Sequence, residues 1–324
     1  MPDRAEASEV PALIALFAGA LAIGSSGIFV RLSETGPTAT AFWRGALALP
    51  LLAVWALLER RGAARGAQWP GSWRDPMFLW AGVFFAGDLA LWHSSLLLIP
   101  IAVSTLEANC APILVTILAW ALWKERPRLP FLLALGLAFG GMLLILAPKL
   151  SGGSHALLGD ALGLGTACFY AAYILAVARL RTRHGTGIVM FASTLVFVVL
   201  LLPIALTQKF LPDSARGWWL LAGCALSAQV LGQSLIAYAL AHLPATFSAV
   251  GLYVQVIAAA GYAWLLLDER LTPLQMAGGV VVLAAIALAR RTRRVRWSAA
   301  AGEPRVHAPR ASIQSSAPRH SESR

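Results

Sequence analysis

The sequence predicts an all-α integral membrane protein with ten transmembrane helices arranged as two inverted five-helix repeats. Apolar residues make up 58% of the 324 residues, charged residues only 13%, and the mean hydropathy is +0.70. These values lie outside the usual range of soluble domains. Apolar runs close to 20 residues long recur along the chain, and about 20 helical residues cross a hydrocarbon core of about 30 Å. The second half of the chain also repeats the pattern of the first.

Proline residues mark the start of several apolar runs, because a missing backbone N–H costs least in the first turn of a helix. Two pairs of runs are separated by almost no loop, which predicts tight antiparallel hairpins. On this basis we predict ten spans, at residues 10–30, 38–58, 77–98, 100–123, 129–147, 156–179, 187–207, 217–240, 244–267 and 273–290.

Arginine and lysine gather in alternate loops, which predicts the orientation of the chain in the membrane. The net charge of +11 therefore reflects loop arginines and gives no reason to expect a nucleic-acid partner. We expect a multi-pass protein of the bacterial inner (plasma) membrane with both termini cytoplasmic. The residues that place these loops inside are Arg60, Arg61, Arg65, Arg74, Lys124, Arg126, Arg128, Arg179, Arg181 and Arg183.

The internal repeat relates SLLLIPIAVSTLEANCAPILVTILAWALWKER to YALAHLPATFSAVGLYVQVIAAAGYAWLLLDER. Pro100 corresponds to Pro244 at an offset of 144, and Gly136 corresponds to Gly279 at an offset of 143. Each half then holds five spans. Since five is odd, the second copy enters the membrane upside down, which is a design of secondary transporters.

The repeat divides the chain into four parts. Residues 1–9 form a cytoplasmic N-terminus, residues 10–148 the first repeat and residues 156–290 the second. Residues 291–324 are rich in Ser, Pro, Ala and Arg with little apolar surface to bury, so we predict a disordered, basic cytoplasmic tail.

Polar side chains inside the apolar spans are the candidate substrate site, because such groups are costly in the membrane and usually face a bundle interior or a cavity. Asp88 lies near the middle of its span, and Trp92 and Ser95 share its helix face. In the second half the polar residues are neutral amides, which also serve to hold helices together. The predicted substrate-binding residues are Asp88, Trp92, Ser95, Gln229, Gln233 and Gln255.

Arg44 and Glu107 form the second candidate group. Each lies seven positions into an inward-running span, about 10 Å below the outer interface, and His93 belongs to the same layer. We predict an ion pair between Arg44 and Glu107 that closes the outer side of the cavity and opens when a ligand carboxylate or a proton breaks it. A permanent brace between helices is the alternative.

Small residues and cysteines favour structural roles. Gly136 with Gly140, and Gly159 with Gly163, form G-x-x-x-G patterns that predict close helix packing. The cysteines are odd in number and widely spaced, so neither a disulfide framework nor a metal site is predicted, and no cofactor is expected. The sequence contains neither H-E-x-x-H nor G-x-S-x-G, the signatures of two large enzyme classes.

The chain resembles the drug/metabolite transporter superfamily, and specifically its ten-helix members with two EamA domains. The resemblance rests on IGSSGIFVRL with ATAFWRGALALPLLA, and on ATFSAV followed by DERLTPLQMAGGVVVLAAIAL. It implies a secondary transporter that moves a small metabolite, such as an amino acid or a similar amphipathic compound, by alternating access, with export frequent among bacterial members. A channel-like permease and, with less support, a membrane-embedded enzyme are the alternatives.

The expected partners are a small-molecule substrate and the lipid bilayer. Proton coupling at Asp88 and assembly as a homodimer are both compatible with the sequence.

Overall fold

In the computed structural model every regular element of the described residues is helical, which confirms the predicted fold class. Residues 302–324 of the predicted tail, Pro100, and the loop residues Arg65 and Arg74 lie outside the described part. The structure describes residues 3–63, 75–99, 101–124, 126–150, 157–268 and 270–301.

The first half contains five spans, two of which are interrupted helices. The first span consists of α1 and α2, and the fourth consists of α5 and α6. The elements are α1 (Asp3–Gly24), α2 (Ser26–Leu32), α3 (Pro37–Ala63), α4 (Met77–Ser95), α5 (Ile101–Ala108), α6 (Ala111–Trp123) and α7 (Leu129–Leu150).

The second half repeats this order. Its third span is built from three consecutive segments, and its fourth span is again interrupted. The elements are α8 (Leu157–Arg181), α9 (Thr186–Ala205), α10 (Ala215–Cys224), the π-helical η1 (Ala225–Gln233), α11 (Ser234–Leu240), α12 (Ala245–Gly251), α13 (Val254–Leu267) and α14 (Pro273–Ala301).

Nine helical segments of the described chain are long and apolar enough to cross a membrane. The third predicted span, α4, is 19 residues long and is not among the nine. Asp88 and His93 lie in it and lower its hydropathy. α14 continues to Ala301, so helix extends beyond residue 290, where the tail was predicted to begin.

The fourth and ninth spans are both interrupted, at equivalent positions of the two repeats. The first interruption, at Asn109 and Cys110, is followed by Pro112, whereas the second, at Leu252 and Tyr253, has no proline beside it. The hydroxyl of Tyr253 donates to the carbonyl oxygen of Asn109 over 2.9 Å, and the two residues are 144 positions apart. This hydrogen bond therefore links the two interruptions directly.

Residues with a left-handed backbone conformation also occur at equivalent positions of the two repeats. Lys124 ends α6 with φ 57° and Asp268 ends α13 with φ 54°, and no other non-glycine residue of the described chain has a positive φ. A left-handed residue at a helix C-terminus lets the chain leave the helix sharply. These two residues are also 144 positions apart, so the repeat is preserved in backbone conformation as well as in sequence.

α3 and α9, which belong to opposite repeats, cap one another at both ends. The side chain of Gln208, just after α9, accepts a hydrogen bond from the N–H of Thr38 in the first turn of α3 over 2.9 Å. The side chain of Glu59, near the end of α3, accepts one from the N–H of Gly187 in the first turn of α9, also over 2.9 Å. Each side chain meets N–H groups that the helix itself leaves unpaired.

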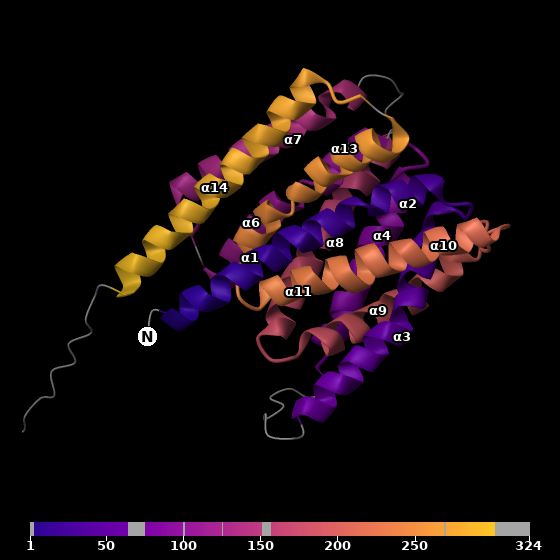
Figure 1. Ribbon diagram of the computed structural model, residues 1–324, viewed down its shortest axis with the longest axis horizontal. Helices are drawn as coiled ribbons and strands as arrows, with labels where there is room; N and C mark the ends of the chain where they lie inside the picture. Colours follow the sequence, from indigo (N-terminus) through magenta and orange to yellow (C-terminus); the bar gives the residue numbers. More distant parts are fainter. Residues whose placement is uncertain are drawn as a thin grey trace, which may run out of the picture.

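α7 and α14 pack together along one edge of the bundle, opposite α3 and α9 (Figure 1). The two helices approach each other closely at two glycines: a Cβ on Gly141 would lie 2.9 Å from the carbonyl oxygen of Gly278, and one on Gly278 would lie 2.6 Å from that of Gly141. Gly136 and Gly140 face open space instead. The prediction that these two glycines pack a helix is wrong, because the contact lies one position further along α7.

Candidate functional site

A buried arginine joins the two halves of the bundle. Arg44 lies on α3 of the first half, and its Nε donates to Oε1 of Gln229, in η1 of the second half, over 3.1 Å. Gln229 in turn donates to the hydroxyl of Thr194 on α9 over 2.9 Å. The guanidinium carbon lies 5.6 Å from the centre of the Phe85 ring, within range of a cation–π interaction.

The π-helical segment η1 places the amides of the second half. Wide turns of this kind occur mostly as short insertions in α-helices and are frequent at functional sites. η1 carries both predicted glutamines, Gln229 and Gln233, and both are buried. Gln233 lies beside the hydroxyl of Tyr170. The π-helical segment packs closely against α1 at Gly232. A Cβ on this residue would lie 2.6 Å from the Ile23 side chain.

Asp88 is the acidic residue that interacts with Arg44. It lies on α4, its exposed fraction is 8%, and that of Arg44 is 7%. The two side chains attract each other electrostatically, without a hydrogen bond between them in the described chain. An isolated charge at this depth is costly, and the attraction between the two groups offsets part of that cost.

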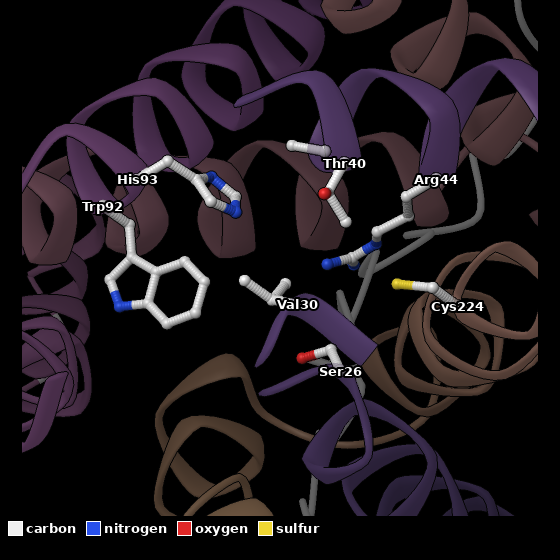
Figure 2. Close-up of a pocket in the computed structure, with 8 residues that line it drawn as sticks. Ser26, Val30, Thr40, Arg44, Trp92, His93 and Cys224 are labelled. Atoms are coloured by element: carbon white, nitrogen blue, oxygen red, sulfur yellow. The ribbon is translucent and has the colours of Figure 1, made fainter. Parts of the chain in front are cut away.

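A small cavity of about 10 Å³ opens beside Arg44 (Figure 2). A space of this size holds about one water molecule. The cavity is therefore too small to hold a molecule much larger than water. Among the residues that line it are Val30, Thr40, Arg44, Trp92, His93 and Cys224.

Two polar atoms at this cavity have no hydrogen-bond partner in the described chain. They are Nη2 of Arg44 and Nε2 of His93, and both side chains extend toward the same space in Figure 2. The other nitrogen of His93 lies 2.7 Å from the carbonyl oxygen of Leu89, one turn earlier in α4. The Trp92 ring packs edge-on against the His93 ring, with 4.9 Å between their centres.

The structure does not pair Arg44 with Glu107, so the prediction of a direct ion pair is corrected. The carboxylate of Glu107 lies against Gly163 of α8, where a Cβ would overlap it, and it interacts with Asp160. The prediction rested on equal depth, and depth does not fix the direction in which a side chain leaves its helix. Arg44 faces Gln229, and its acidic neighbour is Asp88.

Ser95 and Gln255 lie away from the cavity lining. The hydroxyl of Ser95 lies 2.5 Å from that of Ser104, so this contact joins α4 to α5. Gln255 lies just after the interruption of the ninth span and donates to the side chain of Asn109 over 3.4 Å. The six predicted substrate-binding residues therefore do not form one continuous cluster.

Sequence reasoning missed the aromatic wall behind Asp88 and Arg44. The Tyr173 ring of α8 stacks on the Phe85 ring with 4.4 Å between their centres, and Tyr170 lies one turn earlier, 6.2 Å from Tyr173 between ring centres. Two tyrosines three positions apart share a helix face. In an otherwise apolar span that spacing is the signal that could have identified them.

One end of the bundle is closed by Glu34, in the loop between α2 and α3. Its carboxylate accepts hydrogen bonds from the backbone N–H of Asp213 over 2.8 Å and from that of Ser214 over 3.1 Å. It also accepts one from the Ser214 hydroxyl, which holds the pKa of Glu34 below its ordinary value of 4.5. These bonds tie a loop of the first half to the loop between α9 and α10.

The opposite end is closed around His184, between α8 and α9. Nε2 of His184 lies 3.7 Å from Oδ2 of Asp75, and its ring packs against Phe78 with 4.7 Å between centres. Burial lowers the pKa of His184 from its ordinary value of 6.5. Arg181 donates to the carbonyl oxygen of Ala237 over 3.0 Å, so this end also joins α8 to the eighth span.

Two inverted five-helix repeats, helices interrupted at equivalent positions and a buried charge where the repeats meet define the architecture of a membrane transporter. Family comparison agrees with this class. The chain belongs to the EamA-like transporter family, which matches residues 10–147 and 157–291.

Relatives of known function point the same way. The pseudopaline exporter CntI of Pseudomonas aeruginosa, from strains UCBPP-PA14 and PAO1, is 30% identical over 217 residues, which is 66% of this chain and 75% of the exporter. A protein of known crystal structure superposes with a TM-score of 0.70 at 15% identity, over 88% of this chain and 98% of that protein. At this identity the likeness supports the fold alone.

Proposed function

We propose that the protein is a secondary transporter that exports a small metabolite, an amino acid or a similar amphipathic compound, across the bacterial inner membrane by alternating access. The observation that carries the proposal is the buried guanidinium of Arg44. It belongs to the first repeat, is bonded to Gln229 of the second, and has one nitrogen, beside the small cavity, that has no hydrogen-bond partner in the described chain. The similarity to the pseudopaline exporter CntI supports the direction of transport.

The chemistry of the cavity favours a substrate with an acidic group and an apolar part. A guanidinium is the side chain best suited to bind a carboxylate, because its N–H groups match the carboxylate geometry. Trp92 offers an apolar surface beside it. An amino acid, or another compound that combines a carboxylate with a hydrophobic group, fits both features.

Closure at both ends supports alternating access over an open channel. Glu34 ties the two halves together at one end, and Glu59 caps α9 at the other. A cavity of about 10 Å³ between them is too small for the proposed substrate. A cycle that opens one end at a time accounts for such an arrangement. The arginine bias supports an orientation with the Glu59 end and both termini in the cytoplasm.

Asp88 is the proposed site of proton coupling. It is buried and attracted to Arg44, so a substrate carboxylate that binds Arg44 competes with Asp88 for the same charge. Protonation of Asp88 as a substrate carboxylate binds would keep the net charge of the site unchanged for a substrate that carries no ammonium group. Membership of a transporter family favours this cycle over the alternatives of a channel-like permease and a membrane-embedded enzyme.

Counterflow in proteoliposomes tests the proposal. Vesicles loaded with an unlabelled amino-acid mixture should accumulate a labelled amino acid transiently and with saturation. Asp88→Asn should abolish the pH dependence of this counterflow while the protein remains folded. An ohmic current without counterflow would indicate a channel instead. Unchanged flux and pH response in Asp88→Asn would return this residue to a structural role.

A further inference from the structure

The tautomer of His93 is fixed by its place in α4. Its Nδ1 lies 2.7 Å from the carbonyl oxygen of Leu89. Because a carbonyl oxygen only accepts, Nδ1 must carry the hydrogen and donate. A second positive charge next to Arg44 in the apolar interior is costly when no anion accompanies it, which favours the neutral imidazole in the empty site. The ammonium group of an amino acid enters together with its own carboxylate. In the neutral ring Nε2 carries a lone pair and accepts.

The cavity therefore presents an acceptor beside a donor. Nε2 of His93 and Nη2 of Arg44 both lack a partner in the described chain, and the exposed fraction is 2% for His93 and 7% for Arg44. Both line the same space (Figure 2). A buried polar group left unpaired is unfavourable, so a ligand that satisfies both atoms is preferred to one that satisfies only the arginine.

We propose that His93 determines substrate specificity by accepting a hydrogen bond from an N–H or O–H group next to the carboxylate that Arg44 binds. The site then selects α-amino and α-hydroxy acids over the plain carboxylic acid of the same carbon skeleton. This inference rests on the proposed function and adds the substrate class that the site discriminates. His93 acts here as a specificity residue.

Rejection of the plain acid follows from the fixed tautomer. A carboxylate has only acceptor lone pairs to offer, and an acceptor that faces the lone pair of Nε2 is repelled. The missing donor also leaves Nε2 buried and unpaired. Sites built to bond a polar group of the substrate discriminate strongly against analogues that lack it, because their own polar group then stays unsatisfied.

Two substitutions of His93 test the roles of its two ring nitrogens independently. In His93→Asn the amide nitrogen lies near the position of Nδ1 and keeps the bond to Leu89, but no acceptor reaches the cavity. In His93→Gln the amide oxygen reaches the position of Nε2 and keeps the acceptor. Both variants preserve a buried polar side chain, and thermal unfolding of the purified proteins checks that they fold.

Competition in proteoliposomes measures the discrimination. The full-length protein is tested with pairs of acids that differ only in the donor group: L-phenylalanine or L-phenyllactate against 3-phenylpropanoate, and L-leucine against 4-methylpentanoate. We expect the wild type to favour the donor-bearing acid at least about tenfold. The ratio should fall close to one in His93→Asn and stay well above one in His93→Gln.

The outcomes distinguish this inference from the proposed function. Saturable transport with equal handling of the paired acids by the wild type overturns the role of His93 and leaves the transporter proposal standing. A ratio that is unchanged in folded His93→Asn overturns it as well. Absence of saturable flux for every compound of both kinds overturns the proposed function itself, and the inference with it.

Discussion

Replacement of the adjacent glycines Gly140 and Gly141 of α7 by alanine is expected to change the stability of the fold in opposite directions. A Cβ on Gly141 would lie 2.9 Å from the carbonyl oxygen of Gly278 and equally close to the backbone nitrogen of Val282. These backbone atoms cannot rotate away, so we expect Gly141→Ala to destabilise the fold by about 1–3 kcal/mol, the usual cost of overpacking. Gly140 has no atom within 4 Å of the same position, so Gly140→Ala should stabilise the helix by roughly 0.5–1 kcal/mol.

Unfolding of the two variants in mixed detergent micelles, followed by circular dichroism, measures this difference. The variants differ by one position on one helix, so their expression, detergent binding and unfolded states are closely matched. The reasoning predicts that Gly141→Ala unfolds at a lower denaturant concentration than the wild type and Gly140→Ala at an equal or higher one. Equal stability of the two variants would show that α7 and α14 do not meet at Gly141 and Gly278.

Three further predictions concern the ends of the bundle and the interrupted helices. Glu59→Ala and Gln208→Ala should each lower the free energy of unfolding by about 1 kcal/mol, the usual worth of a helix cap, and a loss at only one of them in the same denaturation assay would contradict the reciprocal capping of α3 and α9. Because burial lowers the pKa of His184 from 6.5, the unfolded chain binds a proton more readily, so the free energy of unfolding should fall as the pH drops below 6.5. His184→Gln should flatten this pH dependence, whereas the exposed His242→Gln should not. The same pH dependence in the wild type and both variants would refute the role of His184. Tyr253→Phe should destabilise by about 1 kcal/mol through loss of its bond to Asn109, and an unchanged unfolding transition would show that the bond contributes nothing.

The spans could be predicted from the sequence because hydropathy over a fixed length is enough to place a helix in a bilayer. The interruptions were harder to predict. Pro112 follows the break in the fourth span, but the ninth span breaks at Leu252 and Tyr253 without a proline. There the tertiary bond from Tyr253 to Asn109 joins residues from two repeats, and no local sequence pattern records it.

The sequence indicated which residues gather at the site better than it indicated which of them pair with each other. Arg44, Trp92, His93 and Gln229 do gather where the two halves meet, since a polar group in an apolar span has to face the bundle interior. The partner of Arg44 was predicted from depth alone, and Glu107 turned out to face α8 instead. The rotation of a side chain about its helix depends on packing between helices, which a single sequence does not specify.

Reciprocal features of the two repeats could be seen only in the structure. Glu59 and Gln208 have different chemistry, and no motif relates them in the sequence. They are nevertheless separated by as many positions as Thr38 and Gly187, whose N–H groups they cap. The same capping position is filled by an acid in one repeat and by an amide in the other. A search for identical residues does not find such a correspondence.

The proposed function requires the cavity beside Arg44 to lie on the transport path, and chemical modification of Cys224 reports on that cavity. Cys224 lines this cavity and is buried, whereas Cys110 and Cys168 are elsewhere and can be replaced by serine. The measurement is the rate at which a small methanethiosulfonate reagent modifies Cys224 in proteoliposomes. We predict slow modification during transient opening, reduced by an amino acid that supports counterflow and unaffected by one that does not. A rate indifferent to the transported compound, or no modification while counterflow proceeds, would contradict the account.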